Sequence, residues 1–261
     1  MTAESSSGRS ASASEPFRVK QAKPTERAGP RRPLSAELND DMTDLAELLE
    51  QIGRGVRPPA DGGVSLFPQP PGAARAAVLG FTAHHVIAVD ADPAWLTSQL
   101  GGHDMTRPLK PDFLAALGEH VDAEPGGQDT LLVARGVSTP IGTNDLAVQA
   151  ESALPDHPRV ERARRYRTDV RVARMSGGLV TIGRGLAGRW EISIEVQESR
   201  RGAGIGQKLA EYGRTLVPAD AVLWAQVHPA NVASLRVFLA AGYRPVGAEV
   251  LFTRVATAAR R

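Results

Sequence analysis

The feature that most constrains this chain is an alternating strand that runs through a glycine-rich turn into a helix. From Trp190 to Val196 apolar and polar residues alternate, which is the pattern of a strand with one buried face. Glycine then occupies every second position at 202, 204 and 206, and an amphipathic helix follows. Such a turn presents unpaired backbone N–H groups and the positive end of a helix dipole, and glycine lets an anion approach the backbone. The segment therefore predicts a strand, an anion-binding turn and a helix, in that order.

The turn lacks the spacing of two common phosphate-binding loops. A Walker loop requires Gly-Lys followed by Ser or Thr, whereas this turn continues as Gly206-Gln207-Lys208-Leu209. A dinucleotide fingerprint requires G-x-G-x-x-G and an acid at the end of the next strand. Here the glycines fall as G-x-G-x-G, and the next apolar strand, at 222–227, ends at His228. The turn therefore predicts neither a nucleotide hydrolase nor a dinucleotide-dependent oxidoreductase.

The glycine turn resembles the acyl-CoA-binding motif of the GNAT superfamily of N-acetyltransferases. The residues that carry this resemblance are Arg201-x-x-Gly204-x-Gly206, directly after a strand that ends at Val196. The family continues with a buried parallel strand and a helix of fixed pattern, and the chain is similar at every spacing. The matching residues are the strand 222–227 and then Asn231-x-x-Ser234-x-x-x-Phe238-x-x-x-Gly242-Tyr243. The resemblance is clearest over residues 189–252.

The resemblance implies both a fold and a reaction. The fold is α/β with a mixed sheet, in which two central parallel strands splay apart and the pantetheine arm pairs with a free strand edge. The reaction is transfer of an acetyl group from acetyl-CoA, as cosubstrate, to an amine acceptor by direct attack in a ternary complex, without a metal. The backbone N–H of Val196 is expected near the thioester, where it would stabilise an oxyanion. The implied cofactor-binding residues are Val196, Gln197, Arg201, Gly202, Ala203, Gly204, Ile205, Gly206, Gln207, Asn231, Ser234 and Phe238.

Three side chains are candidates for moving protons. An alkyl ammonium has a pKa of about 10, so a base that works near neutrality helps amine attack. In the family a glutamate about ten residues before the motif arginine often serves as this base, which implies Glu191; burial against Trp190 or Trp224 would raise a carboxylate pKa. Glu195 shares its strand face and is either a second base or an exposed acid. His228, at the end of the parallel strand, fits a catalytic or a structural role.

Phe238 departs from the family pattern. Many relatives have a tyrosine there that protonates the departing thiolate, and phenylalanine cannot do so. A thiol has a pKa of about 8.5, so its thiolate leaves without an acid, and the loss bears on rate more than on whether transfer occurs. The departure keeps a second hypothesis open, in which the chain is an acyl-CoA-binding sensor or partner module without turnover.

The chain is expected to divide into three parts. Residues 1–33 are rich in Ser, Ala, Arg and Pro and are expected to be a disordered basic tail. Residues 34–75 are expected to hold an amphipathic acidic helix at 34–52, stopped at Gly53, and then a Pro- and Gly-rich linker. Residues 76–256 are expected to form the GNAT-like domain. Its expected elements before the motif are strands at 77–81, 85–89, 130–134 and 179–182 and helices at 93–100 and 111–120.

An arginine run at 159–174 contains seven arginines and two acids. Two interpretations remain open for it. The run recognises an acidic substrate or the 3′-phosphate of coenzyme A, or it forms a solvated helix face that balances the acidic helix at 34–52.

Composition limits the remaining classes of function. The 261 residues include no cysteine, which excludes disulfides, thiolate metal sites and cysteine nucleophiles and favours a cytoplasmic location. No apolar run is long enough to span a membrane. The formal net charge is +2, from 31 basic and 29 acidic residues, which disfavours a nucleic-acid partner. The expected partners are a coenzyme A thioester and an amine, small molecule or protein, and the sequence leaves a homodimer open.

Overall fold

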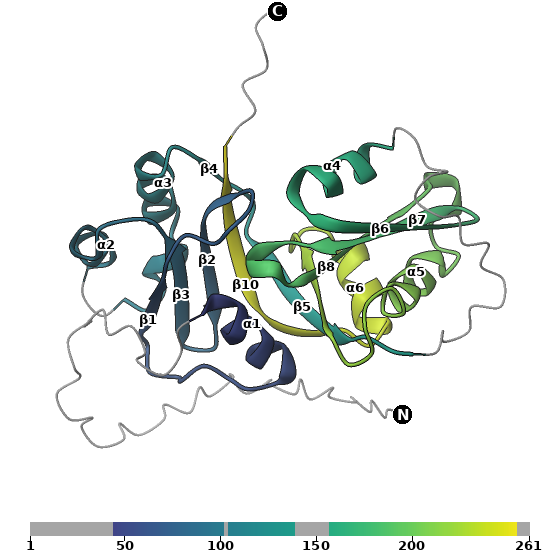
Figure 1. The fold of residues 1–261 in the computed structure, drawn as a ribbon, viewed down its shortest axis with the longest axis horizontal. Coiled ribbons are helices and arrows are strands. Elements are labelled where there is room, and N and C mark those ends of the chain that lie inside the picture. Colours follow the sequence, from purple (N-terminus) through teal and green to yellow (C-terminus); the bar gives the residue numbers. More distant parts are fainter. Residues whose placement is uncertain (1–43, 102–103, 139–156, 255–261) are drawn as a thin grey trace, which may run out of the picture. The chain divides into compact units, whose positions relative to one another are not determined.

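The computed structural model describes residues 44–101, 104–138 and 157–254 (Figure 1). All of them belong to one compact unit of the chain. The tail predicted at 1–33 and the start of the helix predicted at 34–52 lie outside the described residues.

The described residues contain both helices and strands. The helices are α1 (Leu45–Arg54), α2 (Pro93–Leu100), α3 (Pro111–His120), α4 (Pro158–Tyr166), α5 (Ile205–Gly213) and α6 (Val232–Ala240). The strands are β1 (Val64–Phe67), β2 (Ala74–Phe81), β3 (His84–Val89), β4 (Glu124–Pro125), β5 (Asp129–Arg135), β6 (Thr168–Met175), β7 (Gly178–Arg184), β8 (Trp190–Val196), β9 (Val222–Val227) and β10 (Arg244–Thr253). The strands and helices predicted within 77–134 are confirmed, as are the central strand, the two helices after it and the strand between them.

The strands of the described residues form one mixed sheet. Its order is β1-β3-β2-β10-β5-β9-β8-β7-β6, and the short β4 pairs with the end of β10. Two neighbouring pairs, β1 with β3 and β8 with β9, are parallel, and the others are antiparallel. The predicted fold class, α/β with a mixed sheet, is confirmed.

Strand β10 joins the two halves of the sheet. It pairs with β2 on one side and with β5 on the other, so that Glu249 lies opposite both Leu79 and Asp129. The first strands of the described region and the last one therefore share a single sheet, with β10 near its centre (Figure 1).

Helices cover both faces of the sheet. Successive residues of a strand point to opposite faces, and Leu131 and Leu132 of β5 enter two different apolar cores. Leu132 belongs to the core under α5 and α6, and Leu131 belongs to the core under α1. Ile192 of β8 enters the core under α5 and α6. Its neighbour Glu191 therefore points to the opposite face of the sheet, the face that α1 covers.

Two details of the predicted helix and linker are wrong. The helix α1 passes through Gly53 and runs to Arg54, and its C-cap residue is Gly55, which has a φ of 102° in the left-handed region that favours glycine. The predicted linker contains β1, which pairs in parallel with β3. A four-residue strand between Gly- and Pro-rich turns is too short for its alternation to stand out, and Ser65 and Phe67 are its buried residues.

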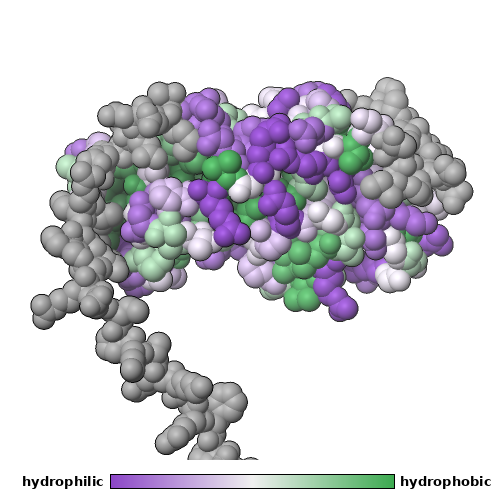
Figure 2. Space-filling view, turned by 90° about the horizontal axis from the view of Figure 1, so that it is seen from below, coloured by the Kyte–Doolittle hydropathy of each residue, from purple (hydrophilic) through white to green (hydrophobic). Residues whose placement is uncertain are grey.

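The surface of the described residues is mixed in polarity. On the face drawn in Figure 2, hydrophilic and hydrophobic residues are interspersed. Of the helices in the described ranges, none has the length and apolar character that crossing a membrane requires.

Candidate active site

The glycine turn adopts backbone conformations that side chains rarely tolerate. Gly202 and Gly204 have φ angles of 81° and 76°, and a Cβ atom added to either would meet no atom within 4 Å. Open space therefore lies in front of this backbone, at the N-terminus of α5. Within the described residues, the backbone N–H groups of residues 202–207 form no hydrogen bond, so they are free to bind an anion.

The two parallel strands separate next to this turn. Strands β8 and β9 pair at three positions and stop at Ile192 and Ala225. Strand β8 nevertheless continues to Val196 and β9 to Val227. The edge of β8 that faces β9 is therefore unpaired over its last four residues, 193–196, which matches the splay that the resemblance implies.

Hydrogen bonding to β7 fixes which way the end of β8 points. The N–H of Gln197 donates to the carbonyl of Gly177 at 2.9 Å, on the β7 side. Because N–H groups alternate between the two edges of a strand, the N–H of Val196 faces the open β9 side. Of the two predicted cofactor-binding residues here, Val196 has a backbone N–H at the splay and Gln197 does not.

The residues of the second predicted motif have structural partners. Asn231 caps α6, since its Oδ1 accepts a hydrogen bond from the N–H of Ser234 at 3.1 Å. Phe238 is 3% exposed and packs edge to face against Tyr243, with 5.0 Å between ring centroids. The Phe238 ring therefore belongs to the apolar core, and its contact with the cofactor stays a prediction. The Tyr243 hydroxyl donates to the carbonyl of Ala210 inside the core, and burial raises the pKa of Tyr243.

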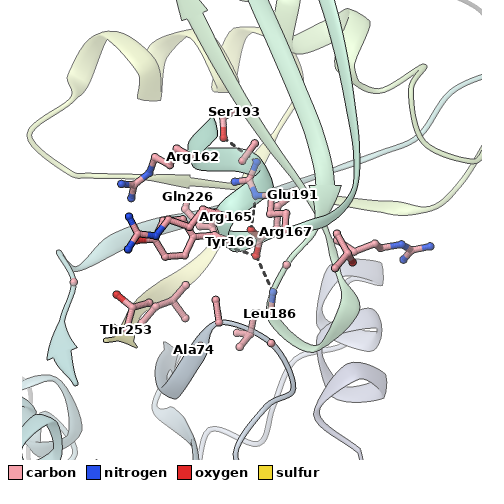
Figure 3. A pocket seen from close by; sticks show the side chains of 18 of the residues that line it. Ala74, Arg162, Arg165, Tyr166, Arg167, Leu186, Glu191, Ser193, Gln226 and Thr253 are labelled. Atoms are coloured by element: carbon pink, nitrogen blue, oxygen red, sulfur yellow. Dashed lines mark hydrogen bonds and ion pairs between the residues drawn. The ribbon is translucent and has the colours of Figure 1, made fainter. Parts of the chain in front are cut away.

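A pocket of about 730 Å³ lies on the opposite face of the sheet from α5 and α6 (Figure 3). Helix α4 supplies one wall, and the ends of β5, β8, β9 and β10 supply the floor. Ser193 of β8 and Gln226 of β9, the first residues beyond the paired segment, both line it. The polar residues used below are Asp129, Arg162, Arg165, Tyr166, Arg167, Glu191, Ser193, Gln226 and Glu249.

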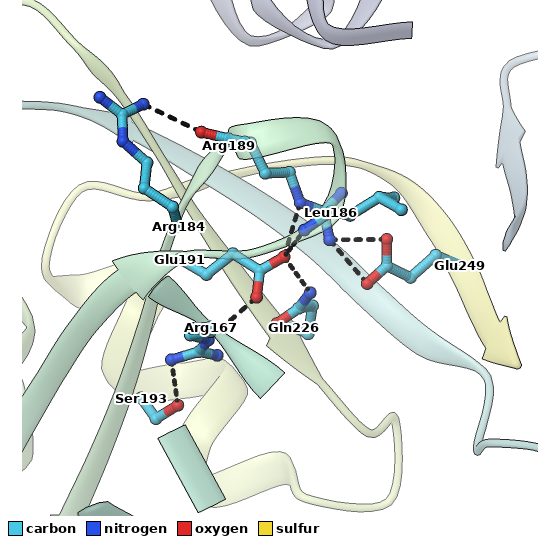
Figure 4. A network of polar contacts seen from close by, with 9 residues as sticks. Arg167, Arg184, Leu186, Arg189, Glu191, Ser193, Gln226 and Glu249 are labelled. Carbon is cyan, nitrogen blue, oxygen red and sulfur yellow. Dashed lines mark hydrogen bonds and ion pairs between the residues drawn. The ribbon is translucent and has the colours of Figure 1, made fainter. Parts of the chain in front are cut away.

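Glu191 is the centre of a buried polar network (Figure 4). Its Oε1 accepts from Arg189 Nε at 2.9 Å, from Gln226 Nε2 at 2.9 Å and from the N–H of Leu186 at 3.2 Å. Its Oε2 accepts from Arg167 Nε at 3.0 Å. The carboxylate is therefore fully engaged by its neighbours.

A glycine makes room for this carboxylate. A Cβ atom on Gly185 would lie 2.2 Å from the carboxylate carbon of Glu191, so a side chain there would displace it. On its far side Arg189 also holds Glu249, since Nη2 of the arginine lies 2.8 Å from both carboxylate oxygens. Arg189 thus bridges two buried glutamates of different strands.

The environments of the two predicted glutamate bases lower their pKa values. Burial favours the protonated form of Glu191, but Arg189 and Arg167 outweigh it and hold the pKa below its usual range. A hydrogen bond from Arg159 Nε, 2.7 Å long, lowers the pKa of Glu195. The expectation that burial against a tryptophan raises the pKa of Glu191 is wrong, because the arginines dominate.

Two further acids line the pocket that the sequence patterns did not single out. Burial raises the pKa of Asp129, and within the described residues no hydrogen bond or ion pair engages its carboxylate. Burial likewise raises the pKa of Glu249, which is 1% exposed. The available signal was an acid at position 249 between the apolar residues Val250 and Ala248, a polar exception in a core strand.

His228 stands at the rim of the pocket. It is exposed, its Nδ1 accepts from the N–H of Ala230 at 3.2 Å, and its ring lies against Gly127, which lines the pocket. Glu191 lines the pocket, whereas His228 lies beside a lining residue and is not itself part of the lining. Glu195 lies further along β8, paired with Arg159.

The arginines of the run at 159–174 contact the glutamates of β8 and line the pocket. Arg159 pairs with Glu195 and Arg167 with Glu191, both on β8. Other arginines of α4 line the pocket, on the face of the sheet away from the glycine turn. No group of three His, Cys, Asp or Glu side chains in the ranges that the structure describes is placed to hold a metal ion.

Comparisons with known proteins give distant structural neighbours. No family model and no curated protein matches the chain. It is similar to a GCN5-related N-acetyltransferase from Sphaerobacter thermophilus, with a TM-score of 0.35 and 16% identity over 54% of this chain and 55% of that one. It is also similar to a GCN5-related N-acetyltransferase from Kribbella flavida, with a TM-score of 0.38 and 13% identity over 82% of this chain and 96% of that one.

A third neighbour is a GNAT-family acetyltransferase from Colwellia psychrerythraea, with a TM-score of 0.31, 14% identity and coverage of 55% of this chain and 62% of that one. The chain thus spans about half the length of the Sphaerobacter protein. Similarity at these scores says nothing of activity, so function has to be argued from the residues of this chain.

Proposed function

We propose that this protein is an N-acyltransferase of the GNAT type, which transfers an acetyl group from acetyl-CoA to an amine in a ternary complex. The observation that carries the proposal is the splay of β8 and β9. It lies between a turn of free N–H groups on the α5 side and a polar pocket on the other side. Both substrates therefore have a route to one gap in the sheet. A cytoplasmic location is part of the proposal and rests on the absence of cysteine.

Each part of the thioester has a matching group in the protein. The N–H groups of 202–207 and the N-terminus of α5 would hold the pyrophosphate. The unpaired edge of β8 would hold the pantetheine amides, as a neighbouring strand would. The N–H of Val196 would stabilise the oxyanion that forms when the amine attacks.

Asp129 is our candidate for the proton acceptor. The amine nitrogen forms a bond to the acyl carbon, the carbon–sulfur bond breaks, and the nitrogen gives up a proton to the base. Glu191 and Glu195 are held by arginines that lower their pKa values, whereas Asp129 lines the pocket with a raised pKa and a free carboxylate. The thiolate leaves without an acid, because residue 238 is a buried phenylalanine.

The phosphate site at the glycine turn is tested by binding of acetyl-CoA. Acetyl-CoA at about 100 times its dissociation constant should add about 2.7 kcal/mol to the free energy of unfolding, seen as a higher melting temperature. Gly204→Val should abolish this shift. Gly62→Val is the matched control, since Gly62 also has a positive φ, 74°, with no atom within 4 Å, and lies outside the turn. A folded Gly204→Val protein with the full shift would refute the phosphate site.

Turnover is measured as release of coenzyme A thiol over a panel of amines. The chain has no cysteine, so a thiol reagent reports only the product. Asp129→Asn should lower kcat by about 10²-fold or more, with partial rescue at high pH, and leave acetyl-CoA binding intact. Glu195→Gln is its control and should change kcat little, because Arg159 already holds that carboxylate. An unchanged kcat in Asp129→Asn would remove Asp129 from the mechanism.

A second function is favoured by one observation. Both glutamates of β8 are ion-paired, which is compatible with a module that binds acyl-CoA without turnover. The same assays separate the two functions. A shift in melting temperature with acetyl-CoA, together with no thiol release from any amine, would support the binding module.

A further inference from the structure

The polar pocket has two zones of opposite charge. Its floor holds the carboxyl groups of Asp129, Glu191 and Glu249, and its α4 wall holds arginines. Arg189 forms ion pairs with both Glu191 and Glu249 and so neutralises much of their charge. Asp129 of the floor and Arg162 of the wall line the same pocket, and among the described residues no ion pair within 4.0 Å joins them.

Two arginines of the α4 wall are gathered around one ring. The guanidinium carbons of Arg162 and Arg165 lie 5.3 Å and 5.5 Å from the ring centroid of Tyr166 (Figure 3). Such contacts hold like charges close together and restrict their side chains. In the part of the chain that the structure describes, no carboxylate lies within 4.0 Å of either guanidinium. Both cations are therefore available to a ligand in the pocket.

We infer that the acceptor carries an anionic group, a carboxylate or a phosphate, beside its amine. Its anion would bind between Arg162 and Arg165, and its ammonium would lie toward Asp129 before it loses a proton. The inference rests on the proposed function and narrows its substrate class to small amines with a negative charge. Planar guanidinium groups bind carboxylate and phosphate oxygens through paired N–H bonds, which fixes orientation as well as adding affinity.

The cationic zone also separates the two substrates. The glycine turn, which would bind the phosphates of acetyl-CoA, lies with α5 on one face of the sheet, and α4 lines the other. Arg162 and Arg165 are therefore placed to bind the acceptor and not the cosubstrate. A variant that loses these charges should keep its affinity for acetyl-CoA.

Matched amine pairs test this inference. The probes are O-phosphoethanolamine against ethanolamine, for phosphate, and β-alanine against β-alaninamide, for carboxylate. Binding is measured by calorimetry and turnover by thiol release. In at least one pair the anionic member should bind about tenfold or more tightly, the equivalent of about one charge-assisted hydrogen bond.

The double variant Arg162→Gln/Arg165→Gln should abolish this preference and leave affinity for the neutral member and for acetyl-CoA unchanged. Arg174→Gln is the matched control, since it removes an exposed arginine of β6 outside the pocket, and it should keep the preference. Equal binding within both pairs, or a preference that survives in the folded double variant, would overturn the inference. A preference in binding with no thiol release from any amine would refute the proposed function and leave the anion site standing.

Discussion

Replacing Glu191 with glutamine should damage the fold before it damages catalysis. The glutamine keeps the shape of the side chain but removes the charge between two arginines. The carboxylate accepts four hydrogen bonds, and the amide nitrogen of the variant would face an arginine N–H as a second donor. Removing one partner of a buried ion pair costs about 3–5 kcal/mol, because the remaining charge is left uncompensated.

The loss should be visible as a large fall in melting temperature. For a domain of this size each kcal/mol is worth about 2–4 °C, so we expect a fall of about 6–20 °C at neutral pH. Because the arginines lower the pKa of Glu191 in the folded state, its contribution is present above its ordinary value of 4.5 and is lost as pH falls through the folded pKa. The difference between the wild type and the variant should therefore shrink in acid.

Glu195→Gln is the matched control on the same strand face. Its carboxylate is 42% exposed and paired with Arg159, so we expect a cost of about 1 kcal/mol or less. Denaturant unfolding at several pH values would measure both variants. Equal stability of the two variants would refute the network argument, and a stable Glu191→Gln protein with a kcat reduced about 10²-fold would restore Glu191 as the base.

Three further predictions concern residues around the site. Tyr243→Phe removes the hydroxyl bond to Ala210, so the free energy of unfolding should fall by about 1 kcal/mol with kcat unchanged; a loss of kcat would make Tyr243 the acid. Gly53→Ala places a Cβ 2.3 Å from a methyl of Val222, so overpacking should cost about 1–3 kcal/mol in denaturant unfolding, and a stabilised variant would contradict the packing of α1 on β9. Glu249 has a raised folded pKa, so its contribution to stability is present below its ordinary value of 4.5 and is lost as pH rises through the folded pKa. The free energy of unfolding of Glu249→Gln, minus that of the wild type, should therefore increase between about pH 4 and pH 8. A difference that stays constant over this range would be evidence against the raised pKa.

Local patterns in the sequence predicted the elements of the fold well. The alternation of 190–196, the proline after the N-cap Asp92, and the glycines at 202 and 204 each depend on neighbours within a few residues. The short β1 was not predicted, because it has only four residues and Gly- and Pro-rich turns flank it. The place of β10 between β2 and β5 was also beyond local patterns, since it depends on residues more than a hundred positions away.

The candidate site was predicted only in part for a related reason. Spacing identified Glu191 and the glycine turn, but not the partners of the glutamate, which come from α4, from β9 and from the turn before β8. Those partners set its pKa, so the chemistry of a correctly located residue was misjudged. Asp129 enters the pocket through the pairing of β5 with β9 and β10, which no local motif specifies.

The central position of β10 ties completion of the sheet to completion of the pocket. Residues up to Thr253 must have been synthesised before β2 and β5 gain their common neighbour. Until then each of these strands has an open edge, which is a template for pairing with another chain. Glu249 reaches the pocket floor on this same strand. Nascent chains that end before β10 therefore lack part of the acceptor site and depend most on protection from aggregation.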